Sequence, residues 1–327
     1  MKLNEMLHIK YPFIQGGMAN IATGTFAAAV SNAGGLGLIG AGGMNTQMLR
    51  EEIRTCKSLT DKPFGVNLML MNPEVDQMAE MIVEEGVKIV TTGAGSPAKY
   101  MARWKENGMM VMPVVSSSLI AKKMEQCGAD AVIAEGTESG GHVGEMTTMA
   151  LVPQIVDSVS IPVIAAGGIA DGRQLAAAFA LGAVGVQLGT CLLVSKECPI
   201  HEAYKAALLK AKDNDTIVTG RIAGTPVRIL KNQMAREYVK MGYYIGVGGV
   251  VTFKNAKKLV QTVAETPMER ILLETDSPYL APEPHRGHRN DSRELIYVIE
   301  KIAEIKGMTL EEVEDITWDN ALRLFQL

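Results

Sequence analysis

A glycine-rich segment with one histidine is the first place in this sequence where side chains could do chemistry. The segment AEGTESGGHVGEMTT (134–148) follows an apolar run, and His142 stands in it close to Gly140, Gly141 and Gly144. Histidine titrates near neutral pH, so it can donate or accept a proton. A lone histidine is usually just a hydrogen-bonded polar residue, but the glycines predict a flexible loop near a ligand. We therefore take His142 as the candidate acid or base.

A second glycine-rich pattern is typical of phosphate binding. Within IPVIAAGGIADGRQLAAAFALGAVGVQLGT (161–190), Gly167-Gly168 ends one apolar run, Asp171-Gly172 opens a helical stretch, and Gly189-Thr190 ends the next run. Barrel enzymes often bind phosphate at such a corner, with backbone N–H groups of two loops and a helix N-terminus. The stretch has no acidic cluster for a catalytic metal. A phosphorylated organic cofactor therefore fits it better than a metal.

Eight short apolar runs, each ending in glycine or a small polar residue, must position these segments. They are PFIQGGM (12–18), LGLIGAGG (36–43), FGVNLML (64–70), VKIVTTGAG (87–95), MVMPVVSSS (110–118), AVIAEG (131–136), PVIAAGG (162–168) and GVQLGT (185–190). Amphipathic stretches lie between them, and this alternation is typical of parallel strands buried on both faces. The sequence predicts an α/β fold, a (β/α)8 TIM barrel that is complete by about residue 190. Its site is expected at the carboxyl ends of the strands.

The composition excludes few functions but sets a frame. The chain is 47% hydrophobic and 21% charged, and its net charge of −4 gives no electrostatic reason to expect nucleic acid as a partner. Four separated cysteines without a CxxC pair predict reduced thiols in a cytoplasmic protein. The N-terminal MKLNEMLHIKYP has no apolar core, so we expect no signal peptide. No apolar run is long enough to span a membrane, so no membrane partner is expected.

Several motifs together resemble one enzyme family. YPFIQGGMA, KPFGVNLML, VTTGAGSPAKY, VIAEGTESGGHVG, IPVIAAGGIADG and VQLGT stand in order, and TGRIAGTPVRILKNQMAREY continues the pattern to about residue 240. Residues 1–240 are similar to the flavin-dependent enoyl-acyl-carrier-protein reductases and to their relatives, the nitronate monooxygenases (2-nitropropane dioxygenases). The motifs DKPFGVNLML and TTGAG favour the reductase.

The resemblance implies an FMN-binding barrel over residues 1–240. Such an enzyme takes electrons from NADH or NADPH and reduces a 2-enoyl thioester of acyl-carrier protein or coenzyme A in fatty-acid synthesis. By matching motif, His142 is the expected active-site acid. Gly17 and Met18 are expected to face the isoalloxazine, and Asn67 and Thr92 to hydrogen-bond the flavin. Glu135 is expected near the ribityl chain. The phosphate is expected to contact Gly167, Gly168, Gly189 and Thr190. The full set is Gly17, Met18, Asn67, Thr92, Glu135, Gly141, Gly167, Gly168, Gly189 and Thr190.

The sequence after Met241 resembles a different family. Residues 242–327 carry GGVVTFKNAK, LLETDSPYLAP, PHRGHRN and NALRLF in order, which is similar to the C-terminal end, two β/α units, of TatD-type metal-dependent DNases. No Pro- or Ser-rich linker marks the junction near Lys240–Tyr243, which is typical of a chimera of two coding sequences. We expect a C-terminal α/β appendage whose strands at 243–252 and 270–275 and helix at 292–306 pack outside the barrel. Without their original neighbours, these strands are expected to have exposed edges.

The appendage lacks most of a hydrolase site. A TatD-type site needs a His-x-His pair on its first strand, a mid-chain glutamate and further histidines, and the five histidines of this chain form no such pair. Asp276 matches the strand-end carboxylate of that family, but one carboxylate cannot fix a two-metal site. We expect His285 and His288 to be surface residues and predict no metal site. A metal-dependent phosphodiesterase or DNase is therefore the weaker alternative.

Two further alternatives stay open at the level of sequence. One is nitronate monooxygenase activity, and the other is a flavin-binding barrel whose catalysis was lost with the family's own C-terminal segment. The sequence does not distinguish NADH from NADPH, and it does not fix the acyl chain length, a need for a monovalent cation or the oligomeric state, although it is compatible with a homodimer.

Overall fold

The computed structural model describes residues 2–219, 226–231 and 244–325, and the chain divides into two compact units, Met1–Leu230 and Lys231–Leu327. The junction expected near Lys240–Tyr243 lies outside the described residues. No helix within the described ranges is long and apolar enough to cross a membrane.

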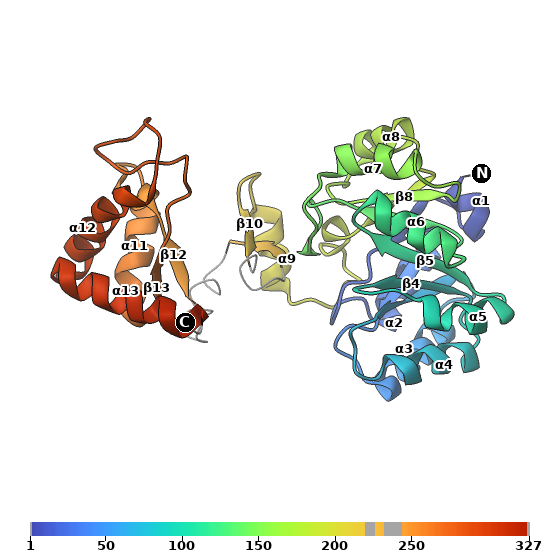
Figure 1. The fold of residues 1–327 in the computed structure, drawn as a ribbon. Helices are drawn as coiled ribbons and strands as arrows, with labels where there is room; N and C mark the ends of the chain where they lie inside the picture. Colours follow the sequence, from blue (N-terminus) through green and yellow to red (C-terminus); the bar gives the residue numbers. More distant parts are fainter. Residues whose placement is uncertain (1, 220–225, 232–243, 326–327) are drawn as a thin grey trace. The chain divides into compact units, whose positions relative to one another are not determined.

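Eight parallel strands form the centre of the first unit (Figure 1). Their order in the sheet is β1-β9-β8-β6-β5-β4-β3-β2, and a bridge between Ile14 and Leu36 joins the two end strands. This closes the sheet, so the predicted TIM barrel is confirmed. Each strand lies within one of the eight apolar runs: β1 (Phe13–Gln15), β2 (Gly37–Gly40), β3 (Phe64–Met69), β4 (Ile89–Gly93), β5 (Met110–Val115), β6 (Val132–Glu135), β8 (Val163–Ala166) and β9 (Gly185–Leu188).

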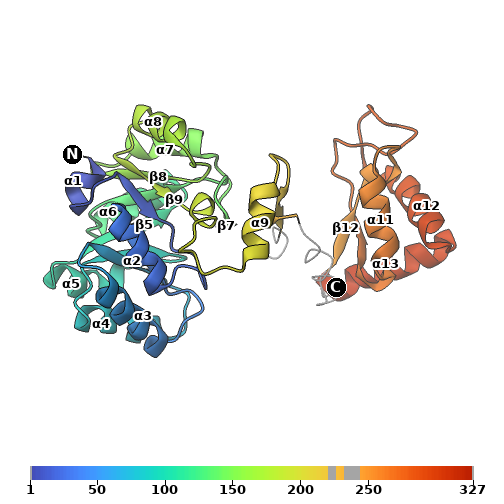
Figure 2. The same ribbon diagram turned by 180° about the vertical axis from the view of Figure 1, so that it is seen from behind.

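Helices surround the strands, as Figures 1 and 2 show from opposite sides. In α3, Leu49, Ile53 and Cys56 recur every three or four residues and are buried against the barrel, while Asn45 accepts a hydrogen bond from Met48 N at 2.8 Å. Such a cap stabilises a helix by about 1 kcal/mol. The surrounding helices are α2 (Gly24–Ala33), α3 (Thr46–Leu59), α4 (Val75–Glu84), α5 (Ala98–Glu106), α6 (Ser118–Gln126), α7 (Thr148–Val156) and α8 (Gly172–Ala180).

A short N-terminal helix closes one end of the barrel. Leu3 and Leu7 of α1 (Leu3–Leu7) pack with the inward-facing Ile14, Leu38 and Ile164, and Leu3 N donates to Val184 O at 2.9 Å, just before β9 begins. The apolar filling therefore occupies the N-terminal end of the strands. Polar inward-facing residues are left at the carboxyl ends, where a barrel site belongs.

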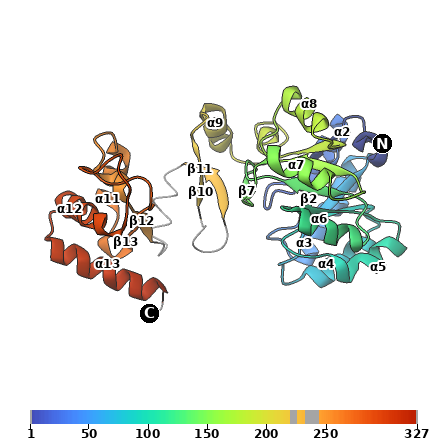
Figure 3. The same cartoon turned by 45° about the horizontal axis from the view of Figure 1, so that its top comes forward.

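A small sheet follows the barrel within the first unit. After α9 (Glu202–Lys210), strands β10 (Thr216–Thr219) and β11 (Val227–Leu230) run antiparallel, and β11 also pairs with β7 (Gly141–His142). Figure 3 shows β10, β11 and β7 side by side. The loop that carries His142 is therefore joined to a hairpin far along the chain.

The second unit has its own sheet and core. Strands β12 (Ile245–Val247) and β13 (Ile271–Leu273) pair in parallel and form a two-stranded sheet separate from that of the barrel. The first is shorter than expected, since a 3-10 turn occupies Gly249–Thr252. Helices α11 (Lys257–Glu265), α12 (Leu295–Lys306) and α13 (Leu310–Phe325) surround a core that includes Val247, Val263, Ile271, Val298, Ile302 and Val313.

One side-chain amide, that of Asn320, makes hydrogen bonds at the outer edge of β13. Glu274 N donates to Val247 O, so the backbone of Glu274 faces β12. Backbone groups alternate between the two edges of a strand, and Ile271 is three residues away, so its carbonyl points to the edge away from β12. There the buried Asn320 donates through Nδ2 to Ile271 O at 2.8 Å and to Met268 O at 2.7 Å. The expectation of exposed strand edges is thus wrong for this edge of β13, because Asn320 of α13 donates a hydrogen bond to the carbonyl of Ile271 there.

We predict that Asn320→Ala destabilises the second unit by about 1–3 kcal/mol, because two buried carbonyls lose their donor. Hydrogen exchange measured by mass spectrometry should show faster exchange in peptides covering 268–273 and 310–325. Asp319→Ala, at an exposed neighbour on α13, is the matched control. Equal exchange in the two variants would contradict the prediction.

Candidate active site

The ends of β1 and β3 meet at the open end of the barrel. A Cβ atom added to Gly17 would lie 2.3 Å from Asn67 Cβ, so only glycine permits this approach. A Cβ atom on Gly40 would lie 2.8 Å from Met18 O. The structure therefore brings together Gly17, Met18 and Asn67, three of the residues expected to bind the cofactor.

Asn67 has a partner that the sequence did not single out. Asn67 Nδ2 donates to Thr91 Oγ1 at 2.8 Å across β3 and β4. The register pairs Asn67 with Thr91 and Leu68 with Thr92, and Leu68 belongs to the core outside the barrel. The Thr92 side chain therefore lies on the outer face, where its buried Oγ1 has no partner among the described residues. A contact between Thr92 and a ligand inside the mouth would have to come from its backbone.

The loops after β8 and β9 form the corner expected to bind phosphate. β8 and β9 are neighbours in the sheet, and Gly167 and Gly168 have φ values of 100° and 71° that favour glycine. No heavy atom lies within 4 Å of a Cβ atom built on Gly189, and Thr190 Oγ1 lies 3.3 Å from one built on Gly140. The structure thus brings these candidates close together, with open space beside Gly189.

The helix that follows this corner is already capped. Asp171 Oδ1 accepts hydrogen bonds from Arg173 N at 2.8 Å and Gln174 N at 3.4 Å. Hydrogen bonds from Arg173, through its side chain and its backbone N–H, hold the pKa of Asp171 at about 2, so this carboxylate is charged at neutral pH. The N–H groups of Arg173 and Gln174 at the start of α8 are therefore already hydrogen-bonded, and phosphate binding at this helix stays a prediction. A phosphate here would depend on the loop N–H groups.

A buried threonine shapes the same corner. Thr148 Oγ1 lies 2.9 Å from both Gly167 O and Glu138 Oε2, and Thr148 N donates to the same Glu138 oxygen at 2.7 Å. A Cβ atom on Gly136 would lie 2.2 Å from Thr148 Oγ1. The first residues of the loop after β6 are therefore packed tightly against the end of β8.

Glu135 and Gln187 form a polar pair on the inner face. Gln187 Nε2 donates to Glu135 Oε2 at 3.4 Å, while the buried Gln187 Oε1 has no partner among the described residues. Burial raises the pKa of Glu135 to about 7, because it disfavours the charged carboxylate. A buried acceptor without a donor is costly, so Gln187 Oε1 fits a ligand donor at the mouth.

His142 does not lie on a free loop. It belongs to β7, where it pairs with Val227, and the next amide, Val143 N, donates to Pro226 O at 3.0 Å. Gly141 has a φ of 77°, and the His142 side chain is exposed. The expectation of a flexible loop is wrong at this position, because a second segment supplies the hydrogen bonds of a strand.

No motif in the sequence marks Thr148, Gln187 or Arg228 as contributors to this rim, and of the two adjacent threonines Thr92 was expected to bind the flavin although Thr91 contacts Asn67. Arg228 Nε donates to Thr137 O in the loop after β6 at 3.1 Å. Gln187 had a usable signal, since it is a polar residue in an otherwise apolar strand just before Gly189. The others act through contacts between segments that are distant in the chain.

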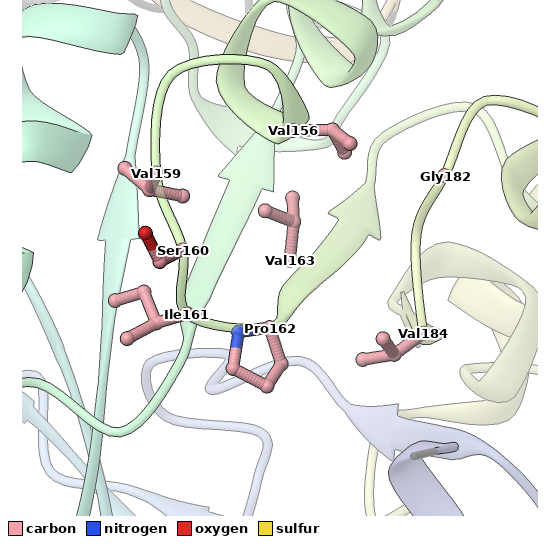
Figure 4. Close-up of a pocket in the computed structure, with 8 residues that line it drawn as sticks. All are labelled: Val156, Val159, Ser160, Ile161, Pro162, Val163, Gly182 and Val184. Carbon is pink, nitrogen blue, oxygen red and sulfur yellow. The ribbon is translucent and has the colours of Figure 1, made fainter.

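A hollow of the first unit lies away from this rim. It has a volume of about 260 Å3 and stands at the start of β8, away from the carboxyl rim (Figure 4). Its lining side chains are mostly apolar, and none of them can do acid–base or redox chemistry: Val156, Val159, Ser160, Ile161, Pro162, Val163, Gly182 and Val184.

The second unit places two carboxylates near each other after β13. A Cβ atom on Gly248 would lie 3.3 Å from both Asp276 Oδ2 and Glu274 Cγ. Burial, together with the charge of Asp276, raises the pKa of Glu274. His285 interacts with Glu294, whose Oε2 lies 2.7 Å from His285 Nδ1. Within the described residues, no three side chains of the types His, Cys, Asp and Glu gather as metal ligands do.

Comparison with known proteins gives two family matches. A family model described as nitronate monooxygenase matches residues 1–265, and one described as TatD related DNase matches residues 230–326. The two matches overlap around the expected junction. They agree with the resemblances found in the motifs of the two parts of the chain.

Individual relatives cover most of the chain. A Mycobacterium tuberculosis protein named (3aS,4S,5R,7aS)-5-hydroxy-7a-methyl-1-oxo-octahydro-1H-indene-4-carboxyl-CoA dehydrogenase is 38% identical, over 72% of this chain and 67% of its own length. A probable nitronate monooxygenase of Staphylococcus saprophyticus is 37% identical, over 71% of this chain and 79% of its own. The structure of FabK from Thermotoga maritima is 40% identical, with a TM-score of 0.71, over 99% of this chain and 96% of its own.

The nitronate monooxygenase match spans the whole barrel, including all the residues that form the rim. It also includes the hairpin that pairs with β7. The chain is therefore an oxidoreductase that belongs to the nitronate monooxygenase family.

Proposed function

We propose that this oxidoreductase binds FMN at the carboxyl-terminal rim and uses NADH or NADPH to reduce a 2-enoyl thioester. The observation that carries the proposal is the corner formed by Gly167, Gly168 and Gly189. Two of these residues have positive φ, and the third faces open space, so their backbone can approach a phosphate closely. Gly17, Met18, Asn67 and Glu135 stand at the same rim and would hold the rest of the cofactor.

The polar groups of the rim support a flavin. The unpartnered Gln187 Oε1 is an acceptor for a hydroxyl or ring N–H group, and the Glu135 carboxyl beside it can donate when it is protonated. Because Gly17 has no side chain, it lies close against Asn67, and both residues stand at the rim where the cofactor is proposed to bind. When bound, FMN supplies two-electron redox chemistry between the nicotinamide and the substrate.

A thioester substrate is supported by the relatives. The motifs of the barrel resemble enoyl-acyl-carrier-protein reductases, FabK is similar along nearly the whole chain, and the mycobacterial relative is named for a carboxyl-CoA compound. The thioester would be carried by acyl-carrier protein or by coenzyme A. In this reaction the Nε2 or Nδ1 proton of His142 passes to the α-carbon of the substrate.

The first test is the visible spectrum of the purified full-length protein during anaerobic addition of NADH or NADPH. We expect bound flavin whose absorption bleaches with the nicotinamide and recovers when an enoyl thioester such as crotonyl-CoA is added. Protein that takes up no FMN on reconstitution would contradict the cofactor. Flavin that bleaches but does not recover with any enoyl thioester would contradict the substrate.

Nitronate monooxygenase activity is the second candidate, because the family match and the staphylococcal relative both carry that name. It would consume oxygen with an alkyl nitronate and need no NAD(P)H. Oxygen uptake with propionate 3-nitronate, measured without nicotinamide, separates the two activities.

We predict that His142→Gln lowers kcat for the enoyl thioester by about 10²- to 10⁴-fold, the usual loss when a proton donor is removed. The flavin content should stay unchanged, since His142 lies in β7 and not in the phosphate corner. The exposed His8 lies outside the rim, so His8→Asn is the control. Full activity in His142→Gln would contradict the role of His142 as acid.

Glu135 gives a prediction for stability against pH in the flavin-free protein. Its folded-state pKa of about 7 lies above the unfolded value of about 4.3, so its stabilising effect is complete below the unfolded value and is lost as pH rises to about 7. The urea midpoint of the wild type should therefore fall, relative to Glu135→Gln, between pH 5 and pH 8. A constant difference between the two proteins would contradict the raised pKa.

A further inference from the structure

The loop between β6 and α7 is fixed at its base and at its tip by different parts of the chain. At the base, Thr137 N donates to Met146 O at 2.8 Å, and Glu138 accepts two hydrogen bonds from Thr148. These contacts hold the ends of the loop to the barrel. They do not reach the segment Gly141–His142 near the middle of the loop.

The tip is held by the hairpin. β11 pairs with β7 in the register Val227 to His142 and Arg228 to Gly141, and Val143 N donates to Pro226 O. β7 has only two residues, so its backbone bonds alone are a weak attachment. The position of His142 therefore depends on how firmly the hairpin itself is attached to the loop.

Arg228 makes that attachment. Its Nε donates to Thr137 O at 3.1 Å, which links β11 to the base of the loop, and its Nη1 donates to Thr216 Oγ1 at 3.0 Å, which links β11 to β10. One planar guanidinium thus joins three segments, and a single lysine ammonium cannot reproduce the two directions. Hydrogen bonds from a charged donor are roughly twice as strong as those between neutral groups.

We propose that Arg228 is a positioning residue that holds His142 for proton transfer, by fastening the β10–β11 hairpin to the base of the His142 loop. This inference rests on the proposed function of His142. Arg228 acts through β7 and not by contact with the substrate. Its loss should therefore loosen one loop and slow one proton transfer, and leave the flavin site intact.

The test compares Arg228→Met, Arg228→Lys and the control Arg103→Met in the full-length protein loaded with FMN. Arg103 pairs with Glu80 on the outer helices and is half-exposed. Hydrogen exchange should be faster in the peptide covering 139–146 for Arg228→Met, and unchanged in the barrel strands and in the control. Arg228→Lys should restore part of the protection.

Kinetics provide the second readout. Arg228→Met should lower kcat by about 10- to 100-fold, with the KM for NAD(P)H and the flavin content unchanged. In the His142→Gln background it should cause no further loss, because two residues that act through one step are not additive. Arg103→Met should leave kcat unchanged.

Two results would contradict the positioning role of Arg228 while leaving the proposed role of His142 standing. One is unchanged exchange at 139–146, and the other is a full additional loss in the His142→Gln background. If His142→Gln turned over at the wild-type rate, the proposed role of His142 would fail and the positioning role would fail with it. The exchange experiment does not depend on turnover, so it shows which of the two has failed.

Discussion

Closure of the barrel depends on a short contact between its first and second strands. Gln15 N donates to Leu36 O at 2.9 Å and Leu36 N to Phe13 O at 3.0 Å, although β1 contains only three residues. Gly16 N donates to Leu188 O at 2.7 Å on the other side, which joins the same strand to β9. These bonds turn an open sheet into a ring. All the polar ends of the strands then face one mouth, and the candidate site exists only for that reason.

Much of the barrel could be predicted from the sequence, because each strand is a compact apolar run with a glycine or small polar residue at its end. The choice between the two faces of a strand was harder. Thr91 and Thr92 are adjacent, identical and both buried, and a strand covered on both sides has no alternation to show which one faces inward. The pairing of β3 with β4 settles the matter through Asn67.

The rest of the site depends on contacts that no local pattern encodes. Glu135 and Gln187 are 52 residues apart, and Arg228 and Thr137 are 91 apart, so only the folded chain brings them together. The cap of α8 is different, since Asp171 followed three residues later by Gln174 is a capping box that the sequence already contains. In the second unit the helix expected at 292–306 is found as a 3-10 turn at Ser292–Glu294 followed by α12, whose buried Val298, Ile299 and Ile302 show the helical spacing already present in the sequence.

The hairpin has a consequence for how such a chain tolerates exchange of its parts. The strands and helices of the barrel end well before β10, yet β7 finds its described partner in β11, which ends at Leu230, the last residue of the first unit. A chain cut where the eighth strand of the barrel ends would keep a closed ring, but β7 with His142 would lose its pairing strand. The sequence after Leu230 can change without removing a described hydrogen-bond partner of β7. The smallest transferable module is therefore the barrel with its hairpin, and recombination that respects this limit can attach the barrel to an unrelated neighbour.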